Sequence, residues 1–276
     1  MRMNFPAAAL ALVLALPLAS SAPAQQGPKI EVVTVAVRPG VTMRYIAVAS
    51  EGAPKAAVIL LAGGNGALKL DAGGAIGSDL GGNFLIRSRG QFAREGLYVA
   101  ALDAASDRQG GMKGDVRLSQ QHADDISKVI VDVKARSGVP VWVIGTSAGT
   151  LSTANVGARL SRGSSPPRGI ILTSTMTQLD AAGHCGKSVY DAALGSISVP
   201  VLVVSHAEDG CECSPGSAAA VGKLVAALKG SPAKEQKIFT GGNPPVSGPC
   251  DARAQHGYFG IEGNVVKTIA EWIKSH

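Results

Sequence analysis

Ser147 is the residue of this chain whose surroundings most clearly allow nucleophilic chemistry. It stands in the stretch "GTSAG", Gly145 to Gly149, between the apolar run Val139–Ile144 and an expected helix from Ala148 to Leu160. A serine at such a strand–turn–helix junction takes a strained backbone that exposes its hydroxyl, and the flanking glycines let strand and helix pack closely. Because the chain contains 35 glycines, the stretch alone is weak evidence. It needs partners elsewhere in the sequence.

A nucleophilic serine requires a base to take its proton and an acid to orient that base. After a serine in this position, the acid and then the base are expected on loops that follow later strands. Asp209 follows the apolar run Val199–Ser205 and is the expected acid, with Glu208 beside it. His256 lies between the last expected strand and the last expected helix, and is the expected base. A solvated acidic turn and a surface histidine are the alternatives. The other histidines lie at positions less suited to the base: His122, His184, His206 and His276.

Backbone N–H groups near the serine could stabilise an oxyanion, the negatively charged oxygen formed during acyl transfer. One expected donor is the N–H of Ala148, the residue after the nucleophile. The other is expected in the glycine-rich loop Gly63–Gly66, from Gly64 or Asn65. A phosphate-binding role for this loop is disfavoured, because no Lys-Ser/Thr follows and the glycines lack the Gly-x-Gly-x-x-Gly spacing.

The elements that would position these residues alternate between strand and helix. An N-terminal hairpin is expected from Ile30–Val37 and Val41–Ala49, joined by "RPG". Continuously apolar runs then predict strands buried on both faces of a sheet. The order predicts one α/β domain, a mostly parallel sheet with helices on both faces and an antiparallel hairpin at its start. The expected strands are 56–64, 97–103, 139–145, 168–175, 199–205 and 236–242; the expected helices are 83–95, 119–136, 148–160, 216–228 and 263–274.

These motifs together resemble the α/β-hydrolase family from about Ile30 to Ile273. The resemblance rests on the "GTSAG" turn, the "LAGGNG" loop, Asp209 after a strand and His256 before the closing helix. It implies that Ser147 is the nucleophile, His256 the base and Asp209 its orienting acid. It also implies ester or amide hydrolysis with no cofactor and no metal. One departure is "AGGNG", where many members begin with His-Gly, so which amide completes the oxyanion site stays open.

The spacing of the strands also bears on the substrate. Only about 25 residues separate the strands ending near 175 and beginning near 199, too few for a large helical cap. The glycine-rich segment 73–83 is an expected rim of the site. We therefore expect a serine esterase that acts on small-molecule or polymer esters through an acyl-enzyme. A secreted serine peptidase or amidase, and a non-catalytic binding protein on the same fold, are the alternatives.

The N-terminus predicts export from the cytoplasm. Arg2, an apolar stretch from Ala7 to Leu18 and "APA" at 22–24 are typical of a signal peptide at 1–24, cleaved after Ala24. A periplasmic or secreted domain at 25–276, without stable membrane insertion, would remain. The formal net charge of the whole chain, +6, is scattered and aromatics make up 4% of its residues, which disfavours a nucleic-acid groove.

The four cysteines of an exported chain are expected to form two disulfides. Cys211 and Cys213 are too close in sequence to pair comfortably, and the spacing fits no zinc site. We expect Cys211–Cys250 and Cys185–Cys213, with the crossed pairing as the alternative. The first of these bridges would tie the loops of Asp209 and His256 together.

Overall fold

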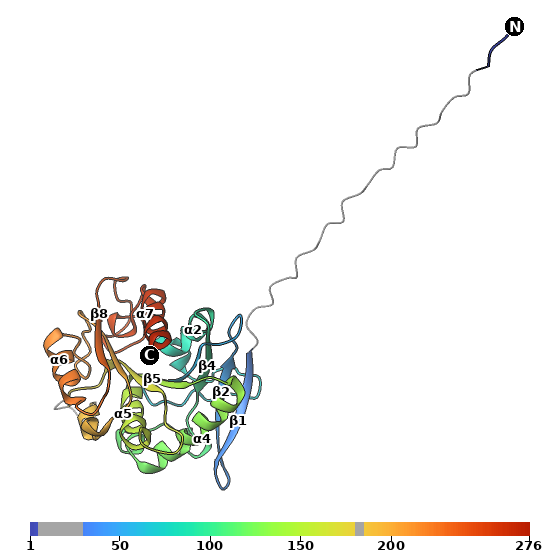
Figure 1. Ribbon diagram of the computed structural model, residues 1–276. Coiled ribbons are helices and arrows are strands. Elements are labelled where there is room, and N and C mark those ends of the chain that lie inside the picture. Colours follow the sequence, from blue (N-terminus) through green and yellow to red (C-terminus); the bar gives the residue numbers. More distant parts are fainter. Residues whose placement is uncertain (5–29, 180–184) are drawn as a thin grey trace.

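The computed structural model describes residues 1–4, 30–179 and 185–276 (Figure 1). The expected cleavage point after Ala24 and nearly all of the expected signal peptide lie outside the described residues, as does His184. Within the described ranges, no helix has both the length and the apolar character needed to cross a bilayer.

Eight strands form one sheet in the order β1-β2-β4-β3-β5-β6-β7-β8. The first two strands form an antiparallel hairpin, β2 pairs antiparallel with β4, and every later pair is parallel. The structure thus confirms the expected fold class. The strands are β1 Ile30–Arg38, β2 Val41–Val48, β3 Ala56–Leu61, β4 Leu97–Leu102, β5 Val141–Ser147, β6 Gly169–Thr175, β7 Val201–His206 and β8 Lys234–Phe239.

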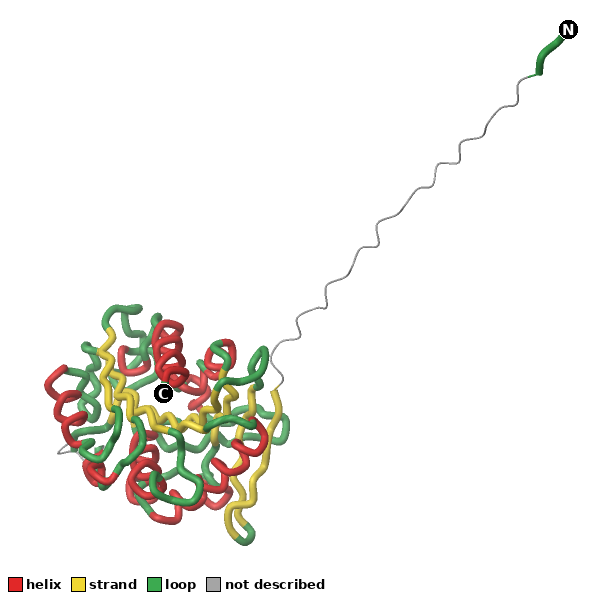
Figure 2. The backbone as a smooth tube through the Cα atoms, viewed as in Figure 1, coloured by secondary structure: helices red, strands yellow, loops and turns green. Residues whose placement is uncertain are grey.

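Helices cover both faces of the sheet (Figures 1 and 2). Apolar side chains of α4, α5 and α6 form a core with one face, and those of α1, α2 and α7 form a second core with the other. Every residue of the central strand β3 is buried, as the continuously apolar run predicts. The helices are α1 Phe84–Arg87, α2 Arg89–Arg94, α3 Gly114–Arg117, α4 Gln120–Ser137, α5 Gly149–Leu160, α6 Ala218–Ala227 and α7 Glu262–Ser275.

Most expected elements shift by one to three residues and the short helix α3 was not expected, but two differences are informative. The helix expected over 83–95 is two short helices, because Ser88 leaves helical geometry with φ −90° and ψ 0° between α1 and α2. The last strand begins at Lys234 rather than 236 and ends at Phe239 rather than 242. Its charged residues Lys234, Glu235 and Lys237 are exposed or partly exposed, which suits a sheet edge, and Gly241 and Gly242, just beyond it, take positive φ.

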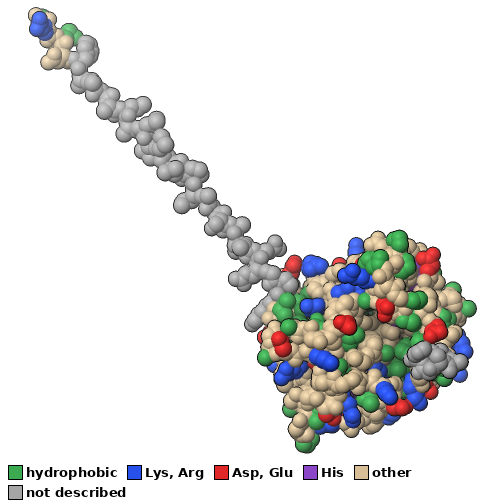
Figure 3. All heavy atoms as spheres, turned by 180° about the vertical axis from the view of Figure 1, so that it is seen from behind, with side chains coloured by type: hydrophobic (Ala, Val, Ile, Leu, Met, Phe, Trp, Pro, Cys, Tyr) green, Lys and Arg blue, Asp and Glu red, His purple; other side chains and the backbone are tan. Residues whose placement is uncertain are grey.

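Charged side chains are interspersed on the surface. On the face drawn in Figure 3, Lys and Arg lie between Asp and Glu without gathering into a stripe. Several pair with each other at the surface, as Arg136 does with Asp132 at 3.0 Å. This distribution fits the expectation that the chain does not bind nucleic acid through a basic groove.

Candidate active site

Ser147 lies at the junction between β5 and α5, where the sequence places it. Its φ of +53° is in the left-handed region, which non-glycine residues rarely adopt. The turn depends on its two glycines. A Cβ on Gly145 would lie 2.4 Å from the carbonyl oxygen of Gly149, and a Cβ on Gly149 would lie 2.2 Å from that of Leu61. Both contacts are far inside van der Waals distance, so the sharp strand-to-helix turn requires glycine at both positions.

The loop Gly63–Gly66, here called the oxyanion loop, follows β3 and lies against the serine. A Cβ on Gly63 would lie 2.9 Å from the Cβ of Ser147. Asn65 is held on both sides, since its carbonyl accepts from the N–H of Met112 and its side chain accepts from the N–H of Ala67. Within the described residues, the N–H groups of Gly64 and Asn65 donate to no acceptor. Either could serve as the expected second donor.

His256 and Asp209 form a buried pair, although 46 residues separate them in the chain. Asp209 follows β7, and His256 lies in a single 3-10 turn, Gln255–Gly257, between β8 and α7. The Nδ1 atom of His256 lies 2.9 Å from Oδ2 and 3.2 Å from Oδ1 of Asp209. The imidazole is 4% exposed, and its Nε2 atom has no hydrogen-bond partner. A carboxylate thus orients the ring, and the nitrogen on its other side is left unpaired.

Tyr258, which sequence reasoning missed, anchors the His256 loop to the sheet. Its hydroxyl donates to the carbonyl of Val204 at 3.0 Å and accepts from the N–H of Ser174 at 3.1 Å. The hydroxyl of Ser174 in turn donates to the carbonyl of His256 at 2.7 Å. Burial raises the pKa of Tyr258, which keeps its hydroxyl protonated as a donor. These bonds fix the His256 backbone relative to the ends of β6 and β7.

Two disulfides join the loops around the pair, Cys211–Cys250 and Cys185–Cys213, with Cα atoms 4.6 and 5.5 Å apart. These are the pairings expected above. The backbone N–H of Cys211 also donates to Oδ1 of Asp209 at 2.9 Å, so the first bridge begins beside the acid. The sulfurs of Cys211, Cys213 and Cys250 lie within 4.8 Å of one another. All three are in disulfides and offer no thiolate to a metal.

Ser147 and His256 line the same pocket, whose volume is about 360 Å³. The loop 240–254 and the segment 79–84 contribute most of its walls. The expected rim 73–83 therefore does border the site. The other lining residues are Gly64, Asp79, Leu80, Asn83, Phe84, Thr146, Ser247, Cys250, Asp251, Ala252, Arg253 and Gly257.

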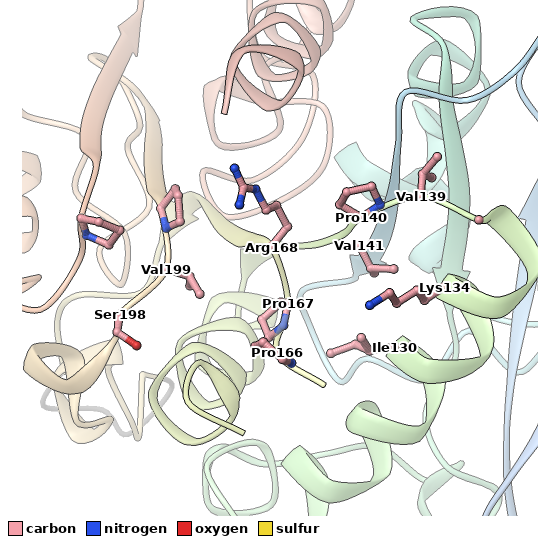
Figure 4. Close-up of a pocket in the computed structure, with 13 residues that line it drawn as sticks. Ile130, Lys134, Val139, Pro140, Val141, Pro166, Pro167, Arg168, Ser198 and Val199 are labelled. Atoms are coloured by element: carbon pink, nitrogen blue, oxygen red, sulfur yellow. The ribbon is translucent and has the colours of Figure 1, made fainter. Parts of the chain in front are cut away.

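A larger concavity of about 610 Å³ lies at the other end of the strands, along the edge of the sheet formed by their amino ends (Figure 4). It is bordered by the chain just before β5, β6 and β7, and its wall is mostly apolar, with Lys134 and Arg168 as its charged residues. Its lining includes no cysteine, histidine or carboxylate. Open α/β sheets bind ligands at the carboxyl ends of their strands, and this concavity lies at the amino ends. We therefore assign chemistry to the smaller pocket.

The other described histidines do not border this pocket. His206 ends β7, with its Nε2 atom 2.9 Å from the carbonyl oxygen of Gly241. His276 stacks on Trp272 near the end of the chain. His122 is buried on α4, where its Nε2 atom lies 2.9 Å from the hydroxyl of Ser152. Among the described histidines, His256 alone shares a cavity with Ser147.

Solved structures with a similar fold include esterases and a dienelactone hydrolase. An esterase of Pyrococcus furiosus is 15% identical, with 90% of this chain and 91% of that chain covered and a TM-score of 0.61. A dienelactone hydrolase of Anabaena variabilis is 14% identical, covering 91% and 99%, with a TM-score of 0.60. A thermostable carboxyl esterase of Bacillus coagulans is 12% identical, covering 89% and 98%, with a TM-score of 0.58. No family model and no curated protein matches the sequence. The chain has the α/β-hydrolase fold.

Proposed function

We propose that this chain of α/β-hydrolase fold is a serine esterase that cleaves carboxylic esters through Ser147, His256 and Asp209. One observation carries the proposal. The imidazole of His256 is buried, is oriented by Asp209 through Nδ1, and keeps Nε2 unpaired in the pocket that Ser147 lines. Leaving a buried polar atom without a partner destabilises a fold by about 1–3 kcal/mol. A base awaiting a proton accounts for that atom, whereas a purely structural histidine does not.

The proposed reaction begins when Oγ of Ser147 attacks the ester carbonyl carbon and His256 Nε2 takes its proton. The carbonyl electrons move to oxygen, and the N–H groups of Ala148 and of Gly64 or Asn65 stabilise that oxyanion. When the tetrahedral intermediate collapses, the bond to the alcohol oxygen breaks. The alcohol leaves with the proton from His256, and an acyl-enzyme remains. A water molecule gives a proton to His256 and attacks the acyl carbon. The carboxylic acid then leaves as Ser147 recovers its proton.

Asp209 supports both steps without accepting a proton itself. Its carboxylate fixes the tautomer that leaves Nε2 free to act as a base, and stabilises the imidazolium formed after each proton transfer. The disulfide Cys211–Cys250 and the hydroxyl of Tyr258 hold the acid and base loops in place.

The structural neighbours and the pocket support an ester as the substrate. The neighbours named above include two esterases and a dienelactone hydrolase. A pocket of about 360 Å³ lies at the small end of the range for small-molecule sites, which favours esters with short acyl or alcohol groups. The segment between β6 and β7 forms only two 3-10 turns, 189–191 and 194–196, among its described residues, in keeping with the short connection read from the sequence.

Labelling with a fluorophosphonate probe, followed by assays on p-nitrophenyl acetate and p-nitrophenyl butyrate, tests the proposal. We expect the purified protein to be labelled at Ser147 and to hydrolyse both esters. The variant Ser147→Ala should do neither while melting near the wild-type temperature. A folded protein that resists the probe and hydrolyses neither ester would favour the non-catalytic alternative. Preferential cleavage of amide substrates would favour the peptidase alternative.

A further inference from the structure

Arg117 is a buried cation that the proposed mechanism does not use. It is the last residue of α3 and is 1% exposed. Within the described part of the chain it forms no ion pair with a carboxylate, and its Nε atom has no partner. A buried charge without a counter-ion is destabilising, so its contacts are informative about its role.

Two of those contacts are backbone carbonyl oxygens at the oxyanion loop. The Nη2 atom of Arg117 donates to the carbonyl of Gly64 at 3.0 Å and to that of Ala62 at 3.3 Å. Gly66 leaves room for this approach, because a Cβ there would lie 2.5 Å from Nη2. The guanidinium therefore lies directly behind the loop whose other side contacts Ser147.

The geometry of the peptide bond, together with these contacts, gives the direction of the N–H of Asn65. In a planar trans peptide the C=O and the following N–H point in opposite directions. Since the carbonyl of Gly64 faces Arg117, the N–H of Asn65 points away from it. Glycine restrains the backbone weakly, and Gly64 and Gly66 both take positive φ, so the loop has little conformational preference of its own. The contacts to Arg117 restrain it from outside.

The remaining contacts leave the positive charge uncompensated. The Nη1 atom donates to the hydroxyl of Ser152 at 3.1 Å, and that hydroxyl lies 2.9 Å from Nε2 of His122. Burial, aided by the nearby Arg117, lowers the pKa of His122 to about 3, so the imidazole is neutral at neutral pH. Burial lowers the pKa of Arg117 only to about 10, so the guanidinium stays charged there.

We propose that Arg117 is a positioning residue for the oxyanion loop. By binding the carbonyls of Ala62 and Gly64, it holds the N–H of Asn65 on the opposite side of the loop, toward the pocket. It also adds positive potential behind the developing oxyanion. This inference rests on the proposed function. It predicts that Arg117 acts on the transition state rather than on substrate binding, because the oxyanion exists only in the transition state and intermediate.

The variant Arg117→Met tests this role, since methionine fills part of the space without charge or donors. Against p-nitrophenyl acetate we expect kcat to fall about 10- to 100-fold with little change in KM, less than the loss of a whole oxyanion donor. Affinity for phenylboronic acid, which forms a tetrahedral adduct with the serine, should fall by a similar factor. Affinity for an unreactive ether analogue of the substrate should not change. The pH profile of kcat/KM should keep its shape, because the base is untouched.

Three further variants keep the test decisive. Arg38→Met makes the same substitution at an arginine that bonds to Asp107 and Asp125 instead, and should keep wild-type kcat. Arg117→Lys retains the charge with fewer donors, and its kcat should lie between those of wild type and Arg117→Met. If Arg117→Met does not fold, the kcat of Arg117→Lys tests the proposal in its place. If neither variant folds, Ser152→Ala tests it, because this change keeps Arg117 but removes the acceptor of its Nη1 atom, and it should lower kcat a few-fold.

Two results would overturn the proposal. One is a folded variant with wild-type kcat and wild-type boronate affinity. The other is an equal loss of affinity for the boronate and the ether analogue, which would indicate a distorted pocket. Failure of the esterase proposal is distinguishable, because the wild-type protein itself would then resist the fluorophosphonate and turn over no ester.

Discussion

The two edges of the sheet differ in backbone strain as well as in chemistry. The described chain has four non-glycine residues with positive φ, and all lie near or beyond the carboxyl ends of strands: Lys69, Ser147, Ser174 and Tyr258. The amino-end edge has the larger concavity, about 610 Å³ against 360 Å³, but none of these strained residues. Backbone strain, rather than cavity size, marks the edge where function is expected.

The largest expected effect is at Ser147, the most informative of the strained residues. Replacing it with glycine should lower kcat by about 10⁴- to 10⁶-fold. The same change should raise the free energy of unfolding by about 1 kcal/mol, because glycine adopts φ +53° without strain. Activity assays and urea unfolding measure the two effects. Ser137→Gly, at the end of α4 in ordinary helical geometry, should instead lower stability. A less stable Ser147→Gly would contradict the role of strain.

The next effect separates Asp209 from its neighbour. Asp209→Asn should lower kcat about 10³- to 10⁴-fold, since the amide no longer fixes the productive tautomer or stabilises the imidazolium. Glu208→Gln, one residue away but exposed, should stay within about twofold of wild type. Steady-state kinetics on one ester compare them. A larger loss at Glu208 would reverse the assignment of the acid.

The two disulfides offer a matched comparison at the catalytic edge. Replacing both Cys211 and Cys250 by serine should lower the free energy of unfolding by about 2–4 kcal/mol, and kcat about tenfold as the acid and base loops lose register. Replacing both Cys185 and Cys213 should lower stability similarly but leave kcat within about twofold. Denaturant unfolding and kinetics are the measurements. Equal effects of the two pairs on kcat would remove the special role of the first bridge.

The next prediction concerns stability alone, at His122 behind the oxyanion loop. Its folded pKa of about 3 lies well below the value of about 6.5 expected in the unfolded chain. The unfolded state therefore binds a proton first, and stability should fall by about 1.4 kcal/mol per pH unit as the pH drops below about 6.5 toward 3. Urea unfolding of wild type and His122→Gln from pH 7 to 4 measures this slope. The variant should show a shallower slope, and identical slopes would contradict the prediction.

The smallest effect is expected at the amino-end edge. Lys134→Trp places a bulky ring into the larger concavity from an exposed position on α4. Because nothing there takes part in the proposed reaction, kcat/KM should stay within about twofold and stability within about 0.5 kcal/mol. A large loss of activity would mean that the two edges are coupled.

The sequence predicts much of this arrangement because local signals coincide with the fold. The turn around Ser147 follows an apolar strand, contains small residues and precedes a helix. All three signals are adjacent in the sequence, so the turn can be predicted from local residues alone. Asp209 and His256 could be chosen from their order along the chain and their places after strands. The short spacing of Cys211 and Cys213 excludes a bridge between them but leaves two pairings open, and the structure has the one expected, Cys211–Cys250 with Cys185–Cys213.

Arg117 and Tyr258 could not be found in this way. Arg117 lies in "GDVRLSQ", a polar segment that looks solvent-exposed, and its burial follows only from packing against the oxyanion loop. Tyr258 has a left-handed backbone, and its partners come from β6 and β7, far away in sequence. The break falls at Ser88, which is neither glycine nor proline, and the nearby Gly90 lies inside α2, so the sequence predicts one continuous helix.

The close approach at Gly149 restricts which substitutions a laboratory library can recover. Since even a methyl group there would overlap the carbonyl oxygen of Leu61, randomising this codon should return glycine alone among folded clones. Saturation libraries intended to widen substrate range therefore gain nothing from this position. They are better directed at side chains that line the pocket, such as Leu80 and Arg253.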